Sequence, residues 1–373
     1  MIVLGAGPAG SIAAHQLASL GARTLLVEKK CFPRRKVCGA CLNIRAIEAL
    51  KSVAVGNLVN DLGGTALDEL EVRFSGRRVR LPLPGGMALS RPRLDAALAE
   101  AAVTAGAVFL QETEGLVGPV QARTRHVVMV QKGRRATVRA RVVLIATGLG
   151  QVRFYGKEGV HSQPLAGSRC GAGCQVAMVP EMDRQGTVFM AVGRRGYVGF
   201  VRLENGELNV AAAFEKSLLR NSGSPAAAAS QILQESGFGA VPELHVACWQ
   251  GTVPLSRRTH PIAGDRFFVL GDASGYIEPF TGEGIAWALE AGLDVAPLAT
   301  RAVDCWDPSL TLAWTVIHER HMARNQHLCR GVTSLLRRPW LTRAALEMAT
   351  RMPALARFMI DRVNTVSPPR QPS

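Results

Sequence analysis

The chain has 373 residues, of which 47% are hydrophobic and 20% are charged, and its formal net charge is +15. This composition is typical of a globular protein, and the length suits a large core divided between two lobes. No apolar run reaches the eighteen or so residues of a membrane span, and no signal peptide is evident. The eight cysteines are scattered, which fits a reducing compartment, so we expect a cytoplasmic protein that could still lie peripherally at a membrane.

The excess of positive charge has two interpretations. It could attract nucleic acid, an anionic membrane or an acidic carrier, or it could be the plain surface of an arginine-rich protein. No basic run is interleaved with aromatic residues as in nucleic-acid grooves, so we expect no nucleic-acid partner. The sequence carries no signal for the oligomeric state.

The beginning of the chain predicts a nucleotide-binding unit. A short apolar strand at 2–4 leads into a glycine-rich turn at 5–10, a helix over 11–20 and a second strand over 24–27 that ends at Glu28. This order of strand, glycine turn, helix, strand and acid is the dinucleotide fingerprint in its full structural context.

Each residue of the fingerprint has a physical role. Gly5 permits the tight turn, Gly7 lets the backbone approach a pyrophosphate, and Gly10 lets the helix pack on the sheet. The helix N-terminus offers N–H groups and a partial positive charge to the phosphates. We expect Glu28 to accept hydrogen bonds from the adenosine ribose; the alternative is a glycine-rich turn without a ligand.

The next part of the chain mixes helices and strands. In chain order we expect a loop at 29–42, a helix from Asn43, a hairpin at 66–83, a helix at 90–105 with Ser90 as its cap, a strand at 108–110, strands at 127–131 and 137–142, and a buried strand at 142–148. The last strand ends in small residues, as parallel strands do where a ligand approaches.

Residues 170–215 predict a second lobe built from antiparallel strands, which would cover a bound cofactor. Charged or glycine turns separate the strands, and Asn205-Gly206 is a strong hairpin signal. A helix at 226–234 and a strand at 246–250 are expected to follow.

A second signature follows this lobe. A strand at 266–270 runs into a Gly-Asp turn, a glycine-rich loop and a helix at 286–293. Asp272 can hydrogen-bond a hydroxyl of a sugar-like chain, and Gly282 and Gly284 let the backbone approach a flat ring. A helix N-terminus there would stabilise the negative charge of a reduced flavin. The alternative is an ordinary loop in which the aspartate caps the helix.

Together these motifs resemble the flavoprotein superfamily of geranylgeranyl reductases and p-hydroxybenzoate-hydroxylase-like monooxygenases, and they are nearer to the geranylgeranyl reductase family. The likeness covers most of 1–160 and 250–295. It depends on Gly5 to Gly10 with Glu28, Pro33-Arg34-x-Lys36-x-Cys38-Gly39, Arg91 before Leu94-Asp95, Ala146-Thr147-Gly148, Gly271-Asp272-Ala273, and Pro279-x-x-Gly282-Glu283-Gly284-Ile285.

The resemblance implies an α/β fold, α+β overall, with a Rossmann-like FAD/NAD(P)-binding domain, an inserted antiparallel-sheet substrate domain and a helical C-terminal tail. The implied parts are the FAD-binding segments 1–65, 90–160 and 254–300, a substrate-lobe hairpin at 66–89, the substrate domain 161–253 and the C-terminal region 301–373. FAD is the implied cofactor, and NADPH or NADH would donate electrons without a domain of its own.

The resemblance also places residues on the cofactor. Glu28 would hold the adenosine ribose, Arg91 would lie near the diphosphate, Asp272 on the ribityl chain, and 282–285 at the pyrimidine edge. The full implied set is Gly5, Gly7, Pro8, Ala9, Gly10, Glu28, Lys29, Lys36, Cys38, Gly39, Arg91, Gly148, Gly271, Asp272, Pro279, Gly282, Glu283, Gly284 and Ile285.

We therefore expect an FAD-dependent oxidoreductase that passes hydride through flavin N5 to a double bond of an apolar or aromatic small molecule. The alternatives are an FAD-dependent hydroxylase or epoxidase of an aromatic or polyketide-like substrate, and a flavin-binding electron-transfer or carrier-associated protein. Of the aromatic and proline motif usual in geranylgeranyl reductases, the middle lobe keeps only Tyr197. The Trp-x-Trp-x-x-Pro segment of flavin-dependent halogenases is absent from the sequence.

The catalytic residues are not fixed by the sequence; Cys38 and Tyr197 are the candidates. Cys38 and Cys41 could exchange a disulfide, or join Cys170 and Cys174 in a zinc site, but we expect no metal and interpret Cys38 as a small residue beside the substrate.

The tail from 301 to 373 is expected to be helical and contains eleven arginines and five acidic residues. Tryptophans among its apolar residues fit a helical cap on the substrate lobe, or an interfacial segment that contacts a membrane or an acidic carrier.

Overall fold

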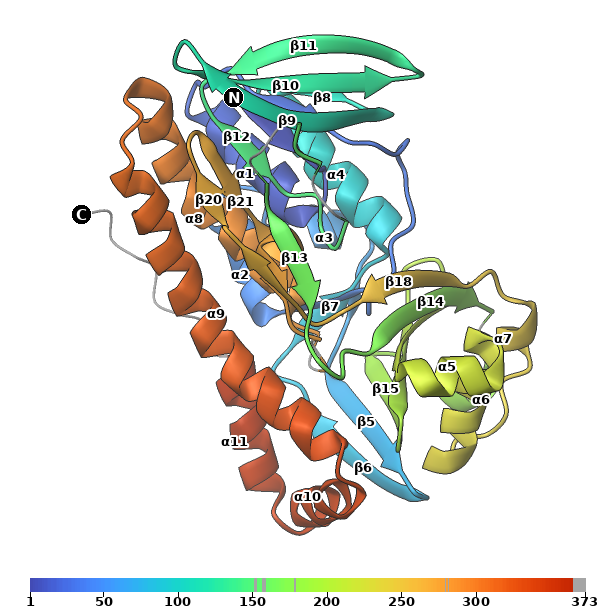
Figure 1. Ribbon diagram of the computed structural model, residues 1–373. Helices are drawn as coiled ribbons and strands as arrows, with labels where there is room; N and C mark the ends of the chain where they lie inside the picture. Colours follow the sequence, from blue (N-terminus) through green and yellow to red (C-terminus); the bar gives the residue numbers. More distant parts are fainter. Residues whose placement is uncertain (151–152, 156–158, 178, 279, 281, 365–373) are drawn as a thin grey trace.

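The computed structural model describes residues 1–150, 153–155, 159–177, 179–278, 280 and 282–364. Figure 1 shows an upper lobe that contains the N-terminus, a lower lobe with its own sheet, and a long helix, α9, that runs along one side of both. This is the mixed α/β fold with a helical C-terminal part that the sequence predicts.

The upper lobe is built on a six-stranded sheet with the order β20-β21-β12-β1-β2-β8. Its strands are β1 (Ile2–Leu4), β2 (Leu25–Val27), β8 (Val108–Leu110), β12 (Val143–Ile145), β20 (Ala263–Gly264) and β21 (Phe267–Val269). All neighbours are parallel except β20 and β21. The carboxyl ends of the parallel strands therefore meet at one edge, where the sequence places its glycine turns.

Helices cover this sheet as the fingerprint predicts. They are α1 (Pro8–Ser19), α4 (Arg91–Thr104) and α8 (Gly284–Asp304), and α1 packs against both of the others. Ser90 occupies the N-cap position of α4, but its side chain does not cap the helix. Instead the hydroxyl donates to Glu204, 2.6 Å away, so the predicted capping bond is replaced by a contact between the lobes.

A three-stranded antiparallel sheet lies beside the upper lobe (Figure 1). It contains β9 (Thr113–Gln121), β10 (Thr124–Gln131) and β11 (Arg134–Ala140). The expected strands at 127–131 and 137–142 are the last two of these; β9 is an addition.

The lower lobe is built on a seven-stranded sheet with the order β18-β14-β17-β16-β15-β5-β6. Its strands are β5 (Glu69–Phe74), β6 (Arg77–Pro82), β14 (Cys170–Val176), β15 (Thr187–Gly193), β16 (Gly196–Arg202), β17 (Leu208–Phe214) and β18 (Gln250–Pro254). The neighbours are antiparallel except β5 and β15, which pair in parallel because β5 enters from a distant part of the chain. Asn205-Gly206 joins β16 to β17, as predicted.

The strand expected at 246–250 is wrong. The chain instead forms the short helix α7 (Glu243–Val246) and begins β18 only at Gln250. The Trp249 ring explains the difference, because its Nε1–H donates to the Leu244 carbonyl at 2.8 Å and holds this segment in a turn.

The two faces of the seven-stranded sheet have different neighbours. One face packs with α5 (Lys216–Ser222), α6 (Pro225–Ser236) and α7 around Phe189, Phe200 and Phe214. The other face presents Val72, Met190 and Tyr197 to the tail helices.

The remaining elements are short, and among them α2 packs against α8 of the upper lobe. They are β3 (Cys41–Asn43), β4 (Thr65–Ala66), β7 (Gly86–Ala88), β13 (His161–Pro164), β19 (Arg257–His260), β22 (Gly275–Tyr276), α2 (Ile44–Lys51), α3 (Leu58–Asp61) and the 3₁₀ turns Pro180–Met182 and Gly271–Ser274.

The tail forms the predicted helices α9 (Ser309–Leu336), α10 (Pro339–Arg351) and α11 (Pro353–Asn364). Trp314 of α9 is buried against the upper sheet and its ring N–H donates to the Val269 carbonyl at 3.1 Å. Leu336 and Leu346 pack on the lower sheet. Across the described residues, none of the helices has the length and apolar content to cross a bilayer.

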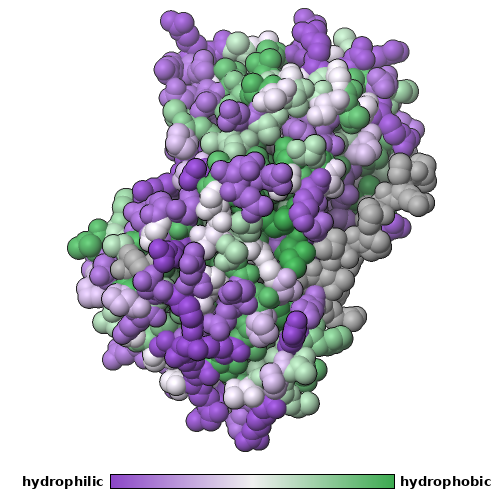
Figure 2. Space-filling model, turned by 180° about the vertical axis from the view of Figure 1, so that it is seen from behind, coloured by the Kyte–Doolittle hydropathy of each residue, from purple (hydrophilic) through white to green (hydrophobic). Residues whose placement is uncertain are grey.

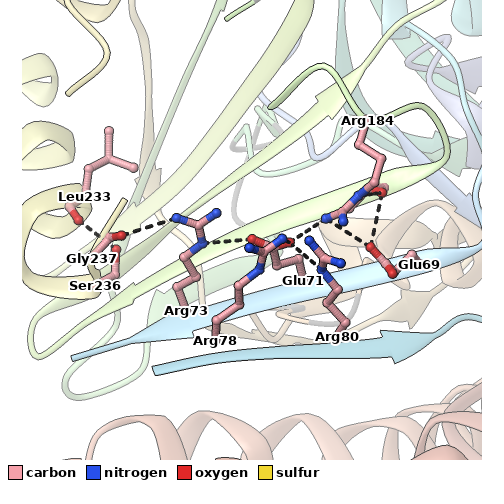
Figure 3. Close-up of polar contacts among 10 residues, drawn as sticks. Glu69, Glu71, Arg73, Arg78, Arg80, Arg184, Leu233, Ser236 and Gly237 are labelled. Atoms are coloured by element: carbon pink, nitrogen blue, oxygen red, sulfur yellow. Dashed lines mark hydrogen bonds and ion pairs between the residues drawn. The ribbon is translucent and has the colours of Figure 1, made fainter. Parts of the chain in front are cut away.

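A buried carboxylate organises the edge of the lower sheet (Figure 3). Glu71 on β5 has no exposed surface, and four guanidinium groups surround it, as the close-up shows. Its carboxylate lies 2.8 Å from Arg73, 2.8 Å from Arg78 and 3.1 Å from Arg80, and it also contacts Arg184; these contacts tie β5 and β6 to the segment before β15.

Candidate active site

A cavity of about 600 Å³ lies where the lobes meet. From behind, hydrophilic side chains cover the periphery of both lobes, and less polar residues gather between them (Figure 2). The residues of the predicted cofactor set that line this cavity are Gly7, Pro8, Ala9, Lys29, Lys36, Cys38, Gly39, Arg91, Gly148, Gly271, Asp272, Gly282, Gly284 and Ile285. Segments up to 278 residues apart in sequence thus meet in one place, Gly7 and Ile285 among them.

Two of the three fingerprint glycines are required by close backbone contacts. Gly5 has φ +103°, and a Cβ there would lie 2.3 Å from the Ala146 carbonyl oxygen. A Cβ on Gly10 would lie 1.9 Å from the Gly5 carbonyl oxygen. Neither glycine lines the cavity; they allow the turn and α1 to fit against the sheet.

Gly7 is different, because a Cβ there would meet no backbone atom within 4 Å. The nearest atoms to a Cβ built on Gly7 would be guanidinium nitrogens of Arg34 and Arg91, at 3.7 and 3.9 Å. The start of α1, which lines the cavity, therefore lies beside two cations. This donor set fits the diphosphate of a dinucleotide.

Asp95 holds both of these arginines in place. It accepts two hydrogen bonds of 2.9 Å from Arg91, and one of its oxygens lies 3.0 Å from Arg34. Burial disfavours the Arg91 cation, but Asp95 and the Cys38 thiol outweigh it and raise the pKa of Arg91. The sequence named Asp95 only as part of a motif; its role as a bridge between two elements is a tertiary feature.

Glu28 lies at the end of β2, beside the glycine turn. Its carboxylate accepts the N–H groups of Ala6 at 3.1 Å and Lys30 at 3.0 Å, and lies 3.4 Å from Arg34. In the described residues it thus fixes the turn, and the role on the adenosine ribose stays a prediction.

The second signature meets the loop at 29–42. Lys36 lies 3.7 Å from Asp272, and its ammonium would lie 2.9 Å from a Cβ on Gly148. The ends of β12 and β21 and the loop therefore converge, as expected if all three contact one cofactor.

The loop before α8 divides its residues between the cavity and the core. Gly282, Gly284 and Ile285 line the cavity. Glu283 instead is buried, where it accepts from Arg45 at 3.5 Å and from the Cys329 thiol at 3.1 Å. Pro279 lies outside the described residues.

Aromatic residues close the cavity on the substrate side. Tyr197 is buried and packs edge-on against Phe280, with ring centroids 5.0 Å apart. Beside it lies the buried ion pair of Arg169 and Glu278, 3.1 Å apart. Burial, then the negative charge of Glu278, raises the pKa of Tyr197 well above 10, so its hydroxyl remains protonated.

Tyr276 is a cavity residue that the sequence analysis missed. It lines the cavity beside Asp272, and burial and the Asp272 charge raise its pKa well above 10. The chain has only three tyrosines, and the position of Tyr276 four residues after Asp272 is the sequence feature that indicates a place in the cavity.

Cys38 and Cys41 also line the cavity. Burial, and then the proximity of Cys38, raises the pKa of Cys41 to about 12, so this thiol stays protonated and is a poor nucleophile or metal ligand. Within the described residues there is no group of three or more histidine, cysteine or acidic side chains that could hold a metal.

Gly10→Ala is expected to abolish flavin binding. The new Cβ would collide with the Gly5 carbonyl and push α1 away from the turn that presents the phosphate donors. Flavin absorbance per protein after purification measures the loss. Gly331→Ala, at an exposed position of α9 where a Cβ meets no atom within 4 Å, controls for a glycine replacement as such. Full flavin content in Gly10→Ala would contradict this assignment of the turn.

Comparison with known proteins agrees with the geometry. Residues 1–153 match the FAD binding domain family. The chain is 27% identical to menaquinone reductase of Mycolicibacterium smegmatis over 388 aligned residues, which cover 96% of this chain and 90% of the relative. It is 26% identical to digeranylgeranylglycerophospholipid reductase of Thermoplasma volcanium over 333 residues, 83% of this chain and 80% of the relative.

The fold is also found among solved structures. A flavoprotein/dehydrogenase from Cytophaga hutchinsonii superposes with a TM-score of 0.80 at 18% identity, covering 97% of this chain and 92% of the other. These findings confirm FAD as the cofactor and the resemblance to the geranylgeranyl reductase family. The chain is an FAD-dependent oxidoreductase, and the reductases of the geranylgeranyl reductase family are among its relatives.

Proposed function

We propose that this enzyme reduces a carbon–carbon double bond in a long apolar substrate of the isoprenoid class. The observation that carries the proposal is the apolar wall of the cavity, which continues from Gly282, Gly284 and Ile285 across the lower sheet. The wall residues on that sheet include Leu70, Val188, Met190, Val201 and Ala211.

Two relatives support this choice of substrate class. The names menaquinone reductase and digeranylgeranylglycerophospholipid reductase both describe reduction of molecules that carry isoprenoid chains. An isoprenoid chain offers no polar group along its length, so burial of its surface supplies the binding free energy, at about 25 cal/mol per Å².

The side chains of this protein would bind the substrate, orient its double bond and donate a proton to it. FAD held at the start of α1 by Gly7, Arg34 and Arg91 would supply the hydride chemistry, with NADPH or NADH as the electron donor. The apolar wall holds the chain and excludes water. Tyr197 lines the cavity and its hydroxyl is protonated, so it would deliver the proton that completes reduction at the other carbon.

An anaerobic assay tests the proposal. The enzyme with bound FAD is mixed with NADPH or NADH and a polyprenyl quinone or polyprenyl phospholipid, and the product is analysed by mass spectrometry. We expect a gain of two hydrogens without oxygen. The same mixture is also incubated in air, where a product that gains an oxygen atom with oxygen uptake, and no reduced product without air, would instead identify a monooxygenase.

Ala211→Phe is expected to restrict the enzyme to substrates with shorter isoprenoid chains. Ala211 lies on β17 on the cavity side, beside Gly199, and a phenyl group there would block the wall. The value of kcat/KM should fall roughly tenfold or more for a long chain and change little for a single isoprene unit. Ala136→Phe, at an exposed position of β11, is the control; an equal loss for both chain lengths would argue against this wall as the chain-binding surface.

A further inference from the structure

The last two helices expose large apolar side chains. Trp340 on α10 is 68% exposed and Phe358 on α11 is 56% exposed. On the opposite side of α10, Thr342 and Leu346 are buried. The other exposed apolar residues of the pair are Met348, Met352 and Leu355.

Exposed arginines lie on the same two helices, Arg343 and Arg351 on α10 and Arg357 on α11. The segment 337–364 contains six arginines and two acidic residues, a formal charge of 6 − 2 = +4. One of the acids, Glu347, already lies 2.8 Å from Arg351 and 3.5 Å from Arg77. The exposed surface of the pair thus combines bulky apolar groups with an excess of cations.

This combination fits a lipid surface. A helix that lies in the membrane interface carries tryptophan, phenylalanine or leucine on one side and arginine or lysine around it. Arginine stems pack on apolar surface while the guanidinium groups reach phosphates, and tryptophan prefers the headgroup level. We propose that the outer surface of α10 and α11 docks on an anionic bilayer.

The helix pair packs against the sheet that lines the cavity, which relates docking on a bilayer to substrate binding. Leu336 and Leu346 share one core cluster with Met190 and Tyr197, and the last two also line the cavity. The inner side of the helix pair is therefore packed against the sheet that forms the substrate wall. This part of the inference rests on the proposed function: an isoprenoid lipid would reach the cavity from the bilayer on which the pair lies.

Vesicle sedimentation tests the docking without any turnover. The FAD-bound protein is mixed with vesicles of phosphatidylcholine alone or of phosphatidylcholine with phosphatidylglycerol. We expect binding to the anionic vesicles that weakens with salt. Two double variants, Trp340→Ala with Phe358→Ala and Arg343→Gln with Arg351→Gln, should each lower the partition coefficient roughly tenfold or more.

The matched control is Arg134→Gln with Arg135→Gln, which removes two exposed arginines from β11 on the other lobe. It should bind as the unmodified protein does, and flavin absorbance verifies that every variant is folded. Three results would overturn the proposal: no binding to anionic vesicles, equal binding by the helix variants, or an equal loss in the control. If the helix pair binds an acidic protein but no anionic vesicles, the proposal is overturned as well, because vesicle binding is absent.

A second measurement separates the docking from the proposed reaction. The helix variants should lose rate on an isoprenoid substrate embedded in vesicles and keep it on a short water-soluble analogue. Vesicle binding that depends on α10 and α11, without reduction of any isoprenoid, would refute the proposed function and leave the docking intact.

Discussion

Asp95→Asn is expected to yield a protein that no longer retains FAD. The carboxylate of Asp95 is fully buried and holds the guanidinium groups of Arg91 and Arg34 beside Gly7. Asparagine keeps the size of the side chain but removes the charge, so the buried Arg91 cation loses its compensation. Breaking a buried ion pair in this way costs about 3–5 kcal/mol of unfolding free energy.

Two measurements separate the effects of this change. Urea denaturation reports the stability, and titration with FAD, followed by flavin fluorescence, reports the affinity, which we expect to fall roughly a hundredfold. Arg34→Gln leaves the Arg91–Asp95 pair intact and should weaken FAD roughly tenfold, with a smaller loss of stability than Asp95→Asn. Asp61→Asn, at an exposed position, is the control. Normal FAD affinity in both site variants would mean that the phosphates lie elsewhere.

Glu71→Gln is expected to destabilise the lower lobe by roughly 2–4 kcal/mol, because four guanidinium groups lose the charge that holds them together. The arginines are partly exposed, so water compensates part of the loss. The surface pair Glu48 and Lys51 provides the control, since Glu48→Gln should cost less than about 1 kcal/mol.

The same carboxylate predicts a pH dependence. Burial alone would raise the pKa of Glu71, but hydrogen bonds from Arg73, Arg184 and Arg80 outweigh burial and lower it below 4.5. A depressed folded-state pKa gives stability that is present above pH 4.5 and is lost as the pH falls through the lower folded value. Denaturation of both proteins at decreasing pH should therefore show the difference between them shrinking below pH 4.5; a constant difference would contradict this role.

The parts of the site that the sequence predicts are local in the chain. Gly5, Gly10 and Glu28 lie within one strand–turn–helix–strand unit, where spacing alone indicates geometry. Asp272 follows its strand directly. For these residues the pattern of glycines and acids predicts the backbone conformation, and the structure places them at the edge of the parallel sheet.

The residues that the sequence could not predict act across long separations. Glu71 forms an ion pair with Arg184, which is more than a hundred residues away in the chain. Glu283 forms an ion pair with Arg45 and does not line the cavity. The parallel pairing of β5 with β15 and the turn held by Trp249 have the same origin, because each depends on a partner that no local pattern specifies.

The lower sheet takes its strands from two stretches of the chain, 69–82 and 170–254, and this separation has a consequence for folding. Strands β5 and β6 come from residues 69–82, whereas β18 ends at Pro254, after a complete segment of the upper lobe has intervened. Neither sheet can close until most of the polypeptide has left the ribosome, since β21 of the upper sheet ends at Val269. We therefore expect that a fragment ending before Gln250 completes neither sheet, because it lacks β18 of the lower sheet and β21 of the upper one.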